Sequence, residues 1–555
     1  PKENLPLLLD HKNNMNKYFI TTPIYYVNDK PHIGHAYTTM VADVLARFHR
    51  SLGDKTHFLT GTDENSQKNV QAMEKAGETN LQGYLDRMAG SWQQTWKDTG
   101  ISFDDFIRTT EERHIAGVNR FWDAVKKSGD IYEGEYVGLY CTGCEAFKNE
   151  SEVVNDRCVL HPNKDLDQLK EKNYFFKLSK YQDQLLALCD DSSEFVMPEE
   201  RRHEIRNIVK DHLNDISISR EAKAVGVGIP VPGDDSQVIY VWFDALVNYL
   251  TAVGYGTDEA LFKQWWPADL HLVGKDIIKF HCALWPAMIL SAAQSDELLR
   301  DASGKALLPK RVHAHGFFTI DGQKISKSLG NAIDPLDFRE TYGLDVVRYY
   351  VLREIAFGSD GDFSRARLHD RYVNDLGNTL GNLLQRTVAM SRKYCENAIP
   401  QTDTLEASLP VSPESAWNGR EGLEVIAKAV TEALHADRAD LALEAIWFGI
   451  GEGKRSGLMQ ANKLIEETQP FKLVKENPKA VGEILYAVLE SLRWHAVLLG
   501  PLMPETSKKI FAGLGLDAEA ESARLWSESL SWGQLKPGSA LPEPTPLFPR
   551  LEVQS

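Results

Sequence analysis

The chain has 555 residues, of which 43% are hydrophobic and 25% are charged, and its formal net charge is −17. At about 150 residues per domain, this length predicts three or four domains and excludes a mini-protein held together by disulfides. We expect no membrane span, because no segment approaches ~20 uninterrupted apolar residues. Six cysteines are too few for a disulfide scaffold, so we expect an intracellular protein, in the cytoplasm or in an organellar matrix. The net charge repels polyanions, so a nucleic-acid partner requires local basic patches.

The first part of the chain has the pattern of a parallel sheet. Residues 1–16 lack the basic start and long apolar core of a secretory signal, so we interpret them as an N-terminal extension. Residues 18–22 and 57–60 predict strands, and residues 32–50 between them predict a helix. Such a βαβ unit belongs to a mostly parallel sheet, whose ligands lie beyond the carboxyl ends of the strands. The loops that follow these two strands should therefore open on one crevice.

The parallel pattern breaks in the middle of the chain and then resumes. Residues 132–233 form short, charged pieces punctuated by glycine, which predict a small inserted domain. Further strands are predicted at residues 238–242 and 270–274. A hairpin is predicted at residues 317–325, where Asp321-Gly322 suits a type I′ turn. The sheet is therefore split by the insert.

Strand patterns end at about Arg371, and helical periodicity takes over. Residues 401–419, with two prolines and several serines, predict a loop. Two segments carry apolar residues on a single helical stripe: Leu423, Ile426, Val430 and Leu434 in one, and Leu485, Val488 and Leu492 in the other. The last third of the chain therefore predicts an all-helical domain.

His32-Ile33-Gly34-His35 stands where the first strand is followed by its helix. The preceding Pro31 suits a helix start, because that position needs no amide hydrogen. The two histidines share a face of the first turn beside the positive end of the helix, and Gly34 lets a ligand approach the backbone. This arrangement favours a phosphate site; an ordinary first turn with surface histidines is the alternative.

A second motif, Lys324-Ile325-Ser326-Lys327-Ser328-Leu329-Gly330-Asn331, places two lysines and two hydroxyls on one loop. Lysine is a mobile point charge that neutralises polyphosphate oxygens as a bond to phosphorus breaks. By itself such a string is more often a solvated basic loop. The interpretation as a polyphosphate-binding loop is supported because the histidine motif lies on the opposite half of the same split sheet.

Four residues of the predicted insert have metal-ligand spacing. Cys141, Cys144, Cys158 and His161 form a C-x2-C-x13-C-x2-H pattern, which suits a closed tetrahedral zinc site. We therefore expect one structural Zn²⁺ per chain. A redox CxxC is the main rival, but such motifs follow a strand of a compact βαβ domain and have no CxxH partner. The isolated cysteines are expected to be buried apolar residues: Cys189, Cys282 and Cys395.

The two motifs resemble the HIGH and KMSKS signatures of the class I aminoacyl-tRNA synthetases, and among these the chain resembles the methionyl-tRNA synthetases. The resemblance runs from about Lys17 to Arg550. It departs from the family at Ile325, where the signature has methionine, and at Phe471, where tryptophan is usual. Further matching strings are Asp215-Ile216-Ser217-Ile218-Ser219-Arg220, Tyr240-Val241-Trp242-Phe243-Asp244-Ala245-Leu246, Gly274-Lys275-Asp276-Ile277 and Asn382-Leu383-Leu384-Gln385-Arg386.

This resemblance implies a methionine–tRNA ligase, which forms methionyl-adenylate from methionine and ATP with Mg²⁺ and then transfers the methionyl group to tRNA(Met). It implies four catalytic residues: His32, His35, Lys324 and Lys327. It implies ATP contacts at these four and at Gly34, Gly274 and Asp276. It implies methionine contacts at Ile24, Tyr26, Asp63, Trp242, Tyr249 and His281. It implies anticodon contacts at Asn382, Arg386 and Phe471.

The resemblance also gives names to the predicted units of this α/β protein. They are an extension (1–16), a split Rossmann-like catalytic domain (17–131 and 234–330), a zinc-binding insert (132–233), a stem-contact region (331–371) and a helical anticodon-binding domain (372–555). We expect a monomer, since the sequence shows no appended tRNA-binding module of the kind that dimerises some relatives.

Two other classes of function stay open at this point. One is a different adenylate-forming enzyme, either a synthetase for another amino acid or a small nucleotidyltransferase with an HxGH motif. The zinc-ligand pattern in the insert argues against an editing domain of the large branched-chain synthetases. The other class is a non-catalytic tRNA-binding or scaffold protein, which should have lost signature histidines or lysines, and all four are present. Without the resemblance, Trp242 and Tyr249 are interpreted as core aromatics and His281 as a satisfied buried histidine.

Overall fold

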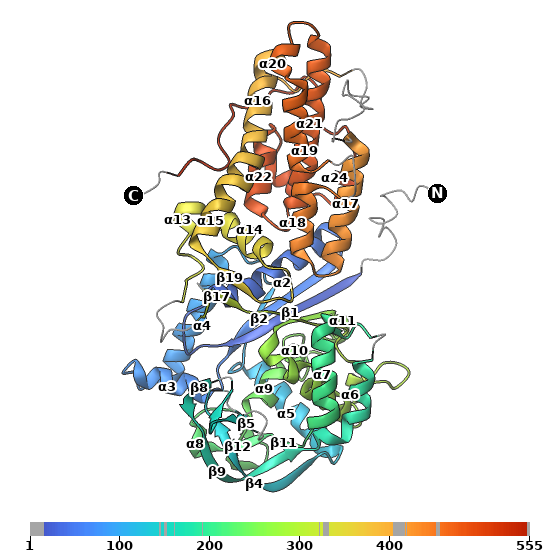
Figure 1. Cartoon of the computed structure of the whole chain (residues 1–555). Coiled ribbons are helices and arrows are strands. Elements are labelled where there is room, and N and C mark those ends of the chain that lie inside the picture. Colours follow the sequence, from blue (N-terminus) through green and yellow to red (C-terminus); the bar gives the residue numbers. More distant parts are fainter. Residues whose placement is uncertain are drawn as a thin grey trace.

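The computed structural model describes residues 16–143, 146–148, 153–159, 161–190, 193–320, 322–325, 332–402, 417, 419–450 and 456–551. Its centre is a sheet of six parallel strands, which confirms the predicted parallel sheet (Figure 1). Across the sheet the strands are β10 (Val196–Met197), β16 (Val312–His315), β15 (Leu270–Gly274), β1 (Lys17–Tyr26), β2 (Lys55–Asp63) and β3 (Asp105–Arg108). Residues expected to form the insert thus supply the edge strand β10.

Helices cover both faces of this sheet. Since successive residues of a strand point to opposite sides, each strand contributes side chains to both of the resulting cores. On β1, Tyr18 and Ile20 join one apolar core, whereas Phe19 joins the other. The first core includes α2 (Ile33–Leu52) and α4 (Leu81–Asp98), and the second includes α5 (Glu112–Lys127) and α12 (Trp285–Ala292). Shorter helices here are α3 (Gln67–Lys75), α9 (Val241–Leu246), α10 (Asn248–Thr251) and α11 (Glu259–Trp265).

The middle of the chain forms antiparallel sheets. Its main feature is a long ribbon in which β4 (Ile131–Cys141) pairs with β9 (Asp167–Phe176). Other elements are β5 (Ala146–Lys148), β6 (Val153–Val154), β7 (Arg157–Cys158), β8 (His161–Asp165), α6 (Gln182–Leu188), α7 (Glu199–His212), β11 (Ile216–Ser217), β12 (Ser219–Glu221), α8 (Ala222–Val225), β13 (Pro230–Val231) and β14 (Asp234–Ile239).

The strand predicted at residues 238–242 is only partly correct. Val238 and Ile239 end β14, which pairs antiparallel with β12 and β13 outside the parallel sheet. Val241 already begins the helix α9. A short run of β-branched and aromatic residues does not distinguish a strand from a buried helix. Here Phe243 and Leu246 are buried in the core beneath the sheet, so packing decides for the helix.

The predicted hairpin is present. β17 (Phe318–Ile320) pairs antiparallel with β18 (Gln323–Lys324), and Thr319 lies opposite Lys324. β19 (Gly361–Phe363) pairs with the other side of β17. Lys324 therefore ends the hairpin, but its side chain and residues 326–331, including Lys327, lie outside what the structure describes.

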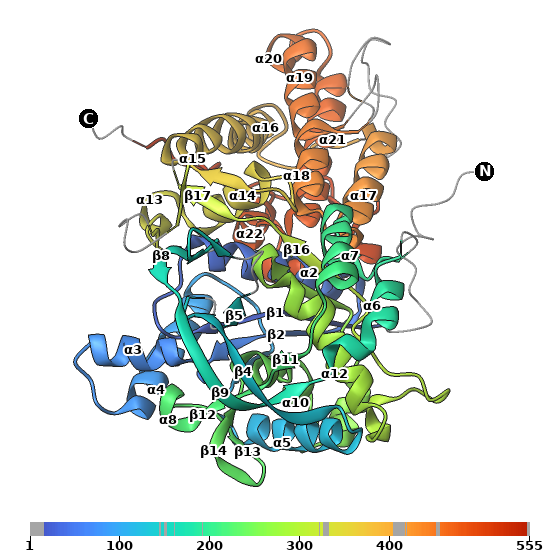
Figure 2. The same ribbon diagram turned by 60° about the horizontal axis from the view of Figure 1, so that its bottom comes forward.

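Beyond β19 the described residues form helices and connecting segments, which confirms the helical C-terminal region. Both predicted stripes are buried, in α17 (Gly419–His435) and α21 (Pro478–Leu499). Figures 1 and 2 show these helices on the side of the sheet where α2 lies. The other α-helices after the hairpin are α13 (Arg339–Tyr342), α14 (Leu344–Glu354), α15 (Arg365–Arg371), α16 (Asn382–Tyr394), α18 (Ala439–Phe448), α19 (Leu458–Thr468), α20 (Pro470–Leu473), α22 (Pro504–Gly513), α23 (Ala518–Ser522) and α24 (Trp526–Ser529), and a π-helix (Tyr372–Gly381) joins α15 to α16.

Two expectations drawn from composition can be compared with the structure. None of the described helices is both long and apolar enough to cross a membrane. Cys189 and Cys282 are buried as expected, whereas Cys395, the C-cap residue of α16, packs against the core but is only partly buried.

Candidate active site

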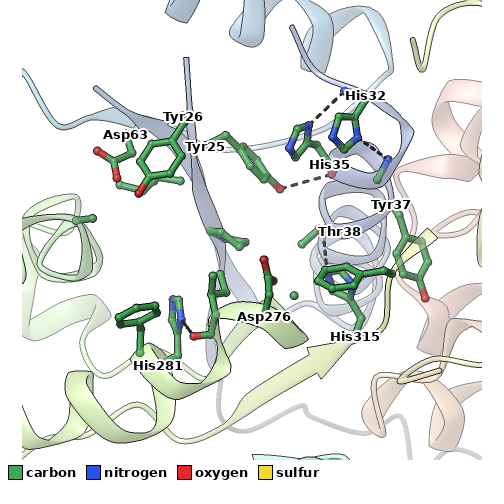
Figure 3. Close-up of a pocket in the computed structure, with 18 of the residues that line it drawn as sticks. Tyr25, Tyr26, His32, His35, Tyr37, Thr38, Asp63, Asp276, His281 and His315 are labelled. Carbon is green, nitrogen blue, oxygen red and sulfur yellow. Dashed lines mark hydrogen bonds between the residues drawn. The ribbon is translucent and has the colours of Figure 1, made fainter. Parts of the chain in front are cut away.

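A cavity of about 440 Å³ opens at the carboxyl ends of β1, β2, β15 and β16. This is the edge of a parallel sheet at which ligands bind. Figure 3 shows side chains converging on it from both halves of the sheet. The predicted ATP and methionine residues that line it are Ile24, Tyr26, His32, Gly34, His35, Asp63, Trp242, Tyr249, Gly274, Asp276 and His281. Only the predicted lysines, Lys324 and Lys327, are not placed, because their side chains lie outside the described part.

The two signature histidines form the N-terminal cap of α2. The Nδ1 atom of His32 accepts a hydrogen bond from the backbone N–H of Gly34 at 3.1 Å, and the Nδ1 atom of His35 accepts one from the backbone N–H of His32 at 3.3 Å. The two rings stack with their centroids 3.7 Å apart. A Cβ atom on Gly34 would lie 3.0 Å from Cε1 of His32, so a larger residue here would require this ring to shift.

These contacts fix the protonation of both rings. An Nδ1 atom that accepts a hydrogen bond carries no proton, so each neutral ring donates through its Nε2–H. Burial lowers the pKa of His32 to about 4 and the pKa of His35 well below its usual range. At neutral pH the start of α2 therefore presents two uncharged donors beside the positive helix end, which suits an anionic ligand.

At the opposite end of the cavity, Tyr249 and His281 form a buried hydrogen-bonded chain. The Nδ1–H of His281 donates to the carbonyl of Ile277 at 3.1 Å, so its Nε2 accepts from the hydroxyl of Tyr249 at 2.8 Å. Burial lowers the pKa of His281 to about 4 and raises the pKa of Tyr249. His281 is thus a satisfied buried histidine that also lines the cavity, so this end offers a neutral surface.

Trp242 forms an aromatic wall beside this pair. Its ring stacks on Phe280, with the centroids 3.9 Å apart and the planes 5° apart. Phe280 begins a π-helical turn, Phe280–Leu284, which also contains His281. Such turns are frequent at functional sites, since they shift the side chains that follow. An apolar aromatic surface next to neutral polar groups suits an uncharged, polarisable side chain such as a thioether.

Asp63 lies at the end of β2, directly opposite Tyr26 in the β1–β2 register. Its side chain is buried, and its Oδ1 atom accepts a hydrogen bond from the backbone N–H of Asn65 at 3.3 Å. The ammonium group of Lys68 lies over the ring of Tyr26, 4.5 Å from its centroid. A buried carboxylate at a strand end is suited to bind a cationic group of a ligand.

Sequence reasoning missed His315, which lines the cavity near Asp276 (Figure 3). Its Nδ1–H donates to the carbonyl of Gly316 at 2.7 Å, and its Nε2 accepts from the hydroxyl of Thr38 at 2.7 Å. His315 is the last residue of β16, a strand that the sequence analysis did not identify. The signal that could have revealed it was the motif His313-Ala314-His315-Gly316 just before the predicted hairpin.

The predicted anticodon residues are on the C-terminal helices α16 and α20, and none of them lines the cavity (Figure 1). Asn382 is exposed at the start of α16, and Arg386 follows one turn later. Arg386 donates through Nη2 to the backbone oxygen and the Oδ1 atom of Asn462, at 2.8 and 2.9 Å. Phe471 on α20 is 52% exposed, which leaves its ring open to a stacking partner.

The predicted zinc ligands are only partly described. Cys141 ends β4, Cys158 ends β7, and both are buried. Cys158 lies opposite His161 in the β7–β8 register, and β8 contacts β4. Cys144 and the side chain of His161 lie outside the described residues. Among the side chains that are described, no group of three His, Cys, Asp or Glu residues is placed to hold a metal.

Comparison with known proteins identifies the family. A family model described as tRNA synthetases class I (M) matches residues 18–158 and 148–388. The methionine–tRNA ligase of Thermotoga maritima is 42% identical over 542 residues, which span 97% of this chain and 81% of that protein. The corresponding ligase of Synechocystis is 42% identical over 550 residues, covering 97% of this chain and 98% of the relative.

A solved structure has the same fold over nearly the whole chain. Mycobacterium tuberculosis methionyl-tRNA synthetase in complex with methionyl-adenylate superposes with a TM-score of 0.85 and 38% sequence identity, covering 97% of this chain and 100% of that one. Since the family model, the relatives and this structure agree, the chain belongs to the methionyl-tRNA synthetases of class I.

Proposed function

We propose that this methionine–tRNA ligase carries out adenylate formation in the cavity at the sheet edge, with the residues assigned below. The observation that carries the proposal is that two histidine donors, an aromatic neutral pocket and a buried carboxylate line one cavity of about 440 Å³. Membership of the methionine family argues against an adenylate-forming enzyme for another substrate. The presence of both signatures argues against a non-catalytic scaffold.

In the first step a carboxylate oxygen of methionine attacks the α-phosphorus of ATP, and the bond to the β-phosphate breaks to release pyrophosphate. His32 and His35 donate through Nε2–H to phosphate oxygens, while Lys324 and Lys327 neutralise the charge that develops on the pyrophosphate. Gly34, Gly274 and Asp276 contact the nucleotide, and Mg²⁺ accompanies ATP. The enzyme positions the reactants and stabilises charge, without a covalent enzyme intermediate.

Methionine binds between the aromatic wall and the end of β2. Asp63 binds its ammonium group, and Ile24, Tyr26, Trp242, Tyr249 and His281 surround its side chain. A Cβ atom on Gly274 would lie 2.8 Å from Oδ1 of Asp276, so glycine lets the backbone come close to this carboxylate. In the second step the terminal ribose hydroxyl of tRNA(Met) attacks the methionyl carbonyl, and AMP leaves.

The anticodon is bound at the far end of the helical region. Asn382 and Arg386 have the donors and acceptors to bind the edges of unpaired bases, and the exposed ring of Phe471 provides a stacking surface. With it we propose a division into a catalytic domain (17–131 and 234–330), an insert (132–233) whose strand β10 completes the catalytic sheet, a stem-contact region (331–371) and an anticodon-binding domain (372–555). Because the net charge of −17 repels tRNA, binding would also require local basic patches beside these base contacts.

The test of the substrate assignment is amino-acid-dependent ATP–pyrophosphate exchange with all twenty amino acids. We expect strong exchange with methionine and weak exchange with leucine, isoleucine, valine and cysteine. Hydrophobic pockets separate near-isosteres by only ~1–3 kcal/mol per methylene, so some exchange with methionine analogues is expected. A maximum with another amino acid would refute the assignment of this pocket.

The insert would hold one structural Zn²⁺ through Cys141, Cys144, Cys158 and His161. The donor types fit, since the thiols of Cys141 and Cys158 are buried and Cys158 lies opposite His161. Four protein ligands leave no position for substrate, so the metal would stabilise the fold of the insert. Elemental analysis should find about one zinc per chain, and Cys158→Ser should lower both zinc content and Tm. Cys395→Ser is the control that keeps the zinc; a wild-type protein without zinc contradicts the proposal.

A further inference from the structure

A buried polar cluster lies directly behind the methionine end of the cavity. It consists of Asn65 after β2, His114 near the start of α5, and Asp244 on α9. The exposed fractions of these residues are 6%, 0% and 0%. None of them has a part in the chemistry assigned above. Buried polar groups of this kind are costly unless they are paired, so their arrangement calls for a physical explanation.

Asn65 connects the two walls of the methionine pocket. Its side-chain Nδ2 donates to Oδ2 of Asp244 at 3.1 Å, and its backbone N–H donates to Oδ1 of Asp63 at 3.3 Å. Asp244 is on the same short helix as Trp242, two residues further along. One residue, through its side-chain amide and its backbone N–H, therefore links the carboxylate at the end of β2 to the helix that carries the aromatic wall.

The hydrogen bonds around His114 indicate which atoms carry protons. The hydroxyl of Thr251 donates to the carbonyl of Asn248 at 3.2 Å, so its Oγ1 accepts from Nδ1–H of His114 at 2.9 Å. This leaves Nε2 of the neutral imidazole as an acceptor. Nε2 lies 3.7 Å from Oδ1 of Asp244, and neither atom has a hydrogen-bond partner among the described residues. A proton on Oδ1 of Asp244 is complementary to this acceptor.

Burial supports a neutral pair. It raises the pKa of Asp244 well above its usual range and lowers the pKa of His114 to about 3. Neutrality also suits the site, because a second carboxylate charge behind Asp63 would compete for the ammonium group in a region of low dielectric constant.

We propose that Asp244 is a positioning residue: a neutral carboxylic acid that, through Asn65, holds Asp63 and Trp242 at the spacing that methionine requires. The proposal rests on the roles of Asp63 and Trp242 given under the proposed function. Asp244 itself does not touch the substrate in this scheme. Its effect should therefore appear in the KM for methionine and not in the KM for ATP.

The experiment compares two substitutions of Asp244 in the full-length enzyme by ATP–pyrophosphate exchange. Asp244→Asn keeps an oxygen for Asn65 and places an amide donor where the acid proton faces His114, so it mimics the neutral acid. Asp244→Ala removes both contacts. We expect Asp244→Ala to raise the KM for methionine about tenfold with the KM for ATP unchanged, and Asp244→Asn to stay within about threefold of the parent value.

Several results would overturn the proposal. If Asp244→Asn is as impaired as Asp244→Ala, the residue acts as a charged carboxylate. If both KM values rise together, the change is a general loss of structure. Should Asp244→Ala fail to fold, Asn65→Ala breaks the same link from the other side and must show the same split between the two KM values.

Asp63→Asn in the same assay separates this proposal from the proposed function. If Asp63→Asn leaves the KM for methionine unchanged, the assigned role of Asp63 fails, and the positioning role of Asp244 fails with it. If Asp63→Asn raises this KM but Asp244→Ala does not, only the positioning role is refuted.

Discussion

The cavity at the sheet edge and the far end of the helical region present their functional side chains in opposite ways. In the cavity, His32, His35 and His281 have defined hydrogen-bond partners and pKa values lowered by burial. At the helical end, Phe471 is 52% exposed and Asn382 is exposed. A cavity of about 440 Å³ is the size of a small-molecule site, whereas unpaired bases require open surface.

This difference shows how one chain serves two kinds of substrate. The small-molecule site gains from fixed, uncharged donors that need no reorganisation when phosphate charge develops. The proposed anticodon site would gain from groups that can exchange partners. Arg386 is an example, since its guanidinium is bound to Asn462 and would have to give up or share that contact to bind a base edge. Substitutions should therefore separate the two regions: the cavity by adenylation, the helical end by aminoacylation.

The largest effect is expected for His32→Ala. The substitution removes an Nε2–H donor at the phosphate end, and loss of one such donor lowers kcat by about 10²–10³-fold. It also removes the cap of α2, which lowers the free energy of unfolding by about 1 kcal/mol. Stopped-flow adenylation, with a separate titration of methionine, tests this; methionine affinity should be nearly unchanged. His203→Ala on the exposed face of α7 is the control. An unchanged adenylation rate would mean that the histidine motif is only a helix cap.

Tyr249→Phe should affect methionine and spare ATP. It leaves Nε2 of His281 without its donor in a buried site, and an unsatisfied buried polar atom costs about 1–3 kcal/mol. The KM for methionine should rise by roughly tenfold, because 1.4 kcal/mol corresponds to a factor of ten. Tyr255→Phe is the matched control, since its hydroxyl bonds to Asp296 outside the cavity. Equal effects of the two substitutions would contradict a specific role of Tyr249.

Phe471→Ala should impair tRNA aminoacylation and leave adenylate formation intact. Loss of a stacking surface for an unpaired base costs about 1–3 kcal/mol, so kcat/KM for tRNA aminoacylation should fall about tenfold. ATP–pyrophosphate exchange should not change. Phe471→Trp should raise aminoacylation, because the larger ring stacks better. Met459→Ala, also exposed on this region, is the control. A loss of exchange in Phe471→Ala would show that the two regions are not independent.

The sequence predicted the parallel sheet best where its strands are long. β1, β2 and β15 and the helix α2 between the first two were identified within a few residues. β10, β16 and β3 were missed, because strands of two to four residues have too few positions to show a period. The same ambiguity explains why the strand predicted at residues 238–242 includes Val241 and Trp242, which belong to α9.

The site was predictable to the extent that chemistry follows strand ends and helix starts. That reasoning identified the histidine motif and the loop after β2. It could not identify the contacts of Thr38 with His315 and of Asn65 with Asp244, because these partners come from segments far apart in sequence. Those contacts depend on how the two halves of the sheet meet, which the periodicity of a single segment does not encode.

The smallest expected effect on activity, and the one that sharpens the contrast most, concerns pH. Burial holds the pKa values of His281 and His315 at about 4 in the folded protein, against 6.5 for an exposed ring. Below pH 6.5 the unfolded chain therefore binds more protons than the folded protein. As a result, these groups lower the free energy of unfolding as the pH falls from about 6.5 to about 4, and they leave it unchanged above pH 6.5. From pH 6 to pH 5 these two groups together should lower the free energy of unfolding by roughly 2 kcal/mol.

Denaturant unfolding across this pH range, paired with adenylation rates between pH 6.5 and 8, provides the measurement. His315→Gln should remove about half of this pH-dependent loss from pH 6 to pH 5, whatever its effect on stability at pH 8. The adenylation rate should show no transition from the cavity histidines between pH 6.5 and 8, since these rings are neutral throughout. A rate transition near pH 6.5 that disappears in a histidine variant would show that this cavity histidine has an ordinary pKa. The contrast between fixed neutral donors in the cavity and exchangeable groups at the helical end would then fail.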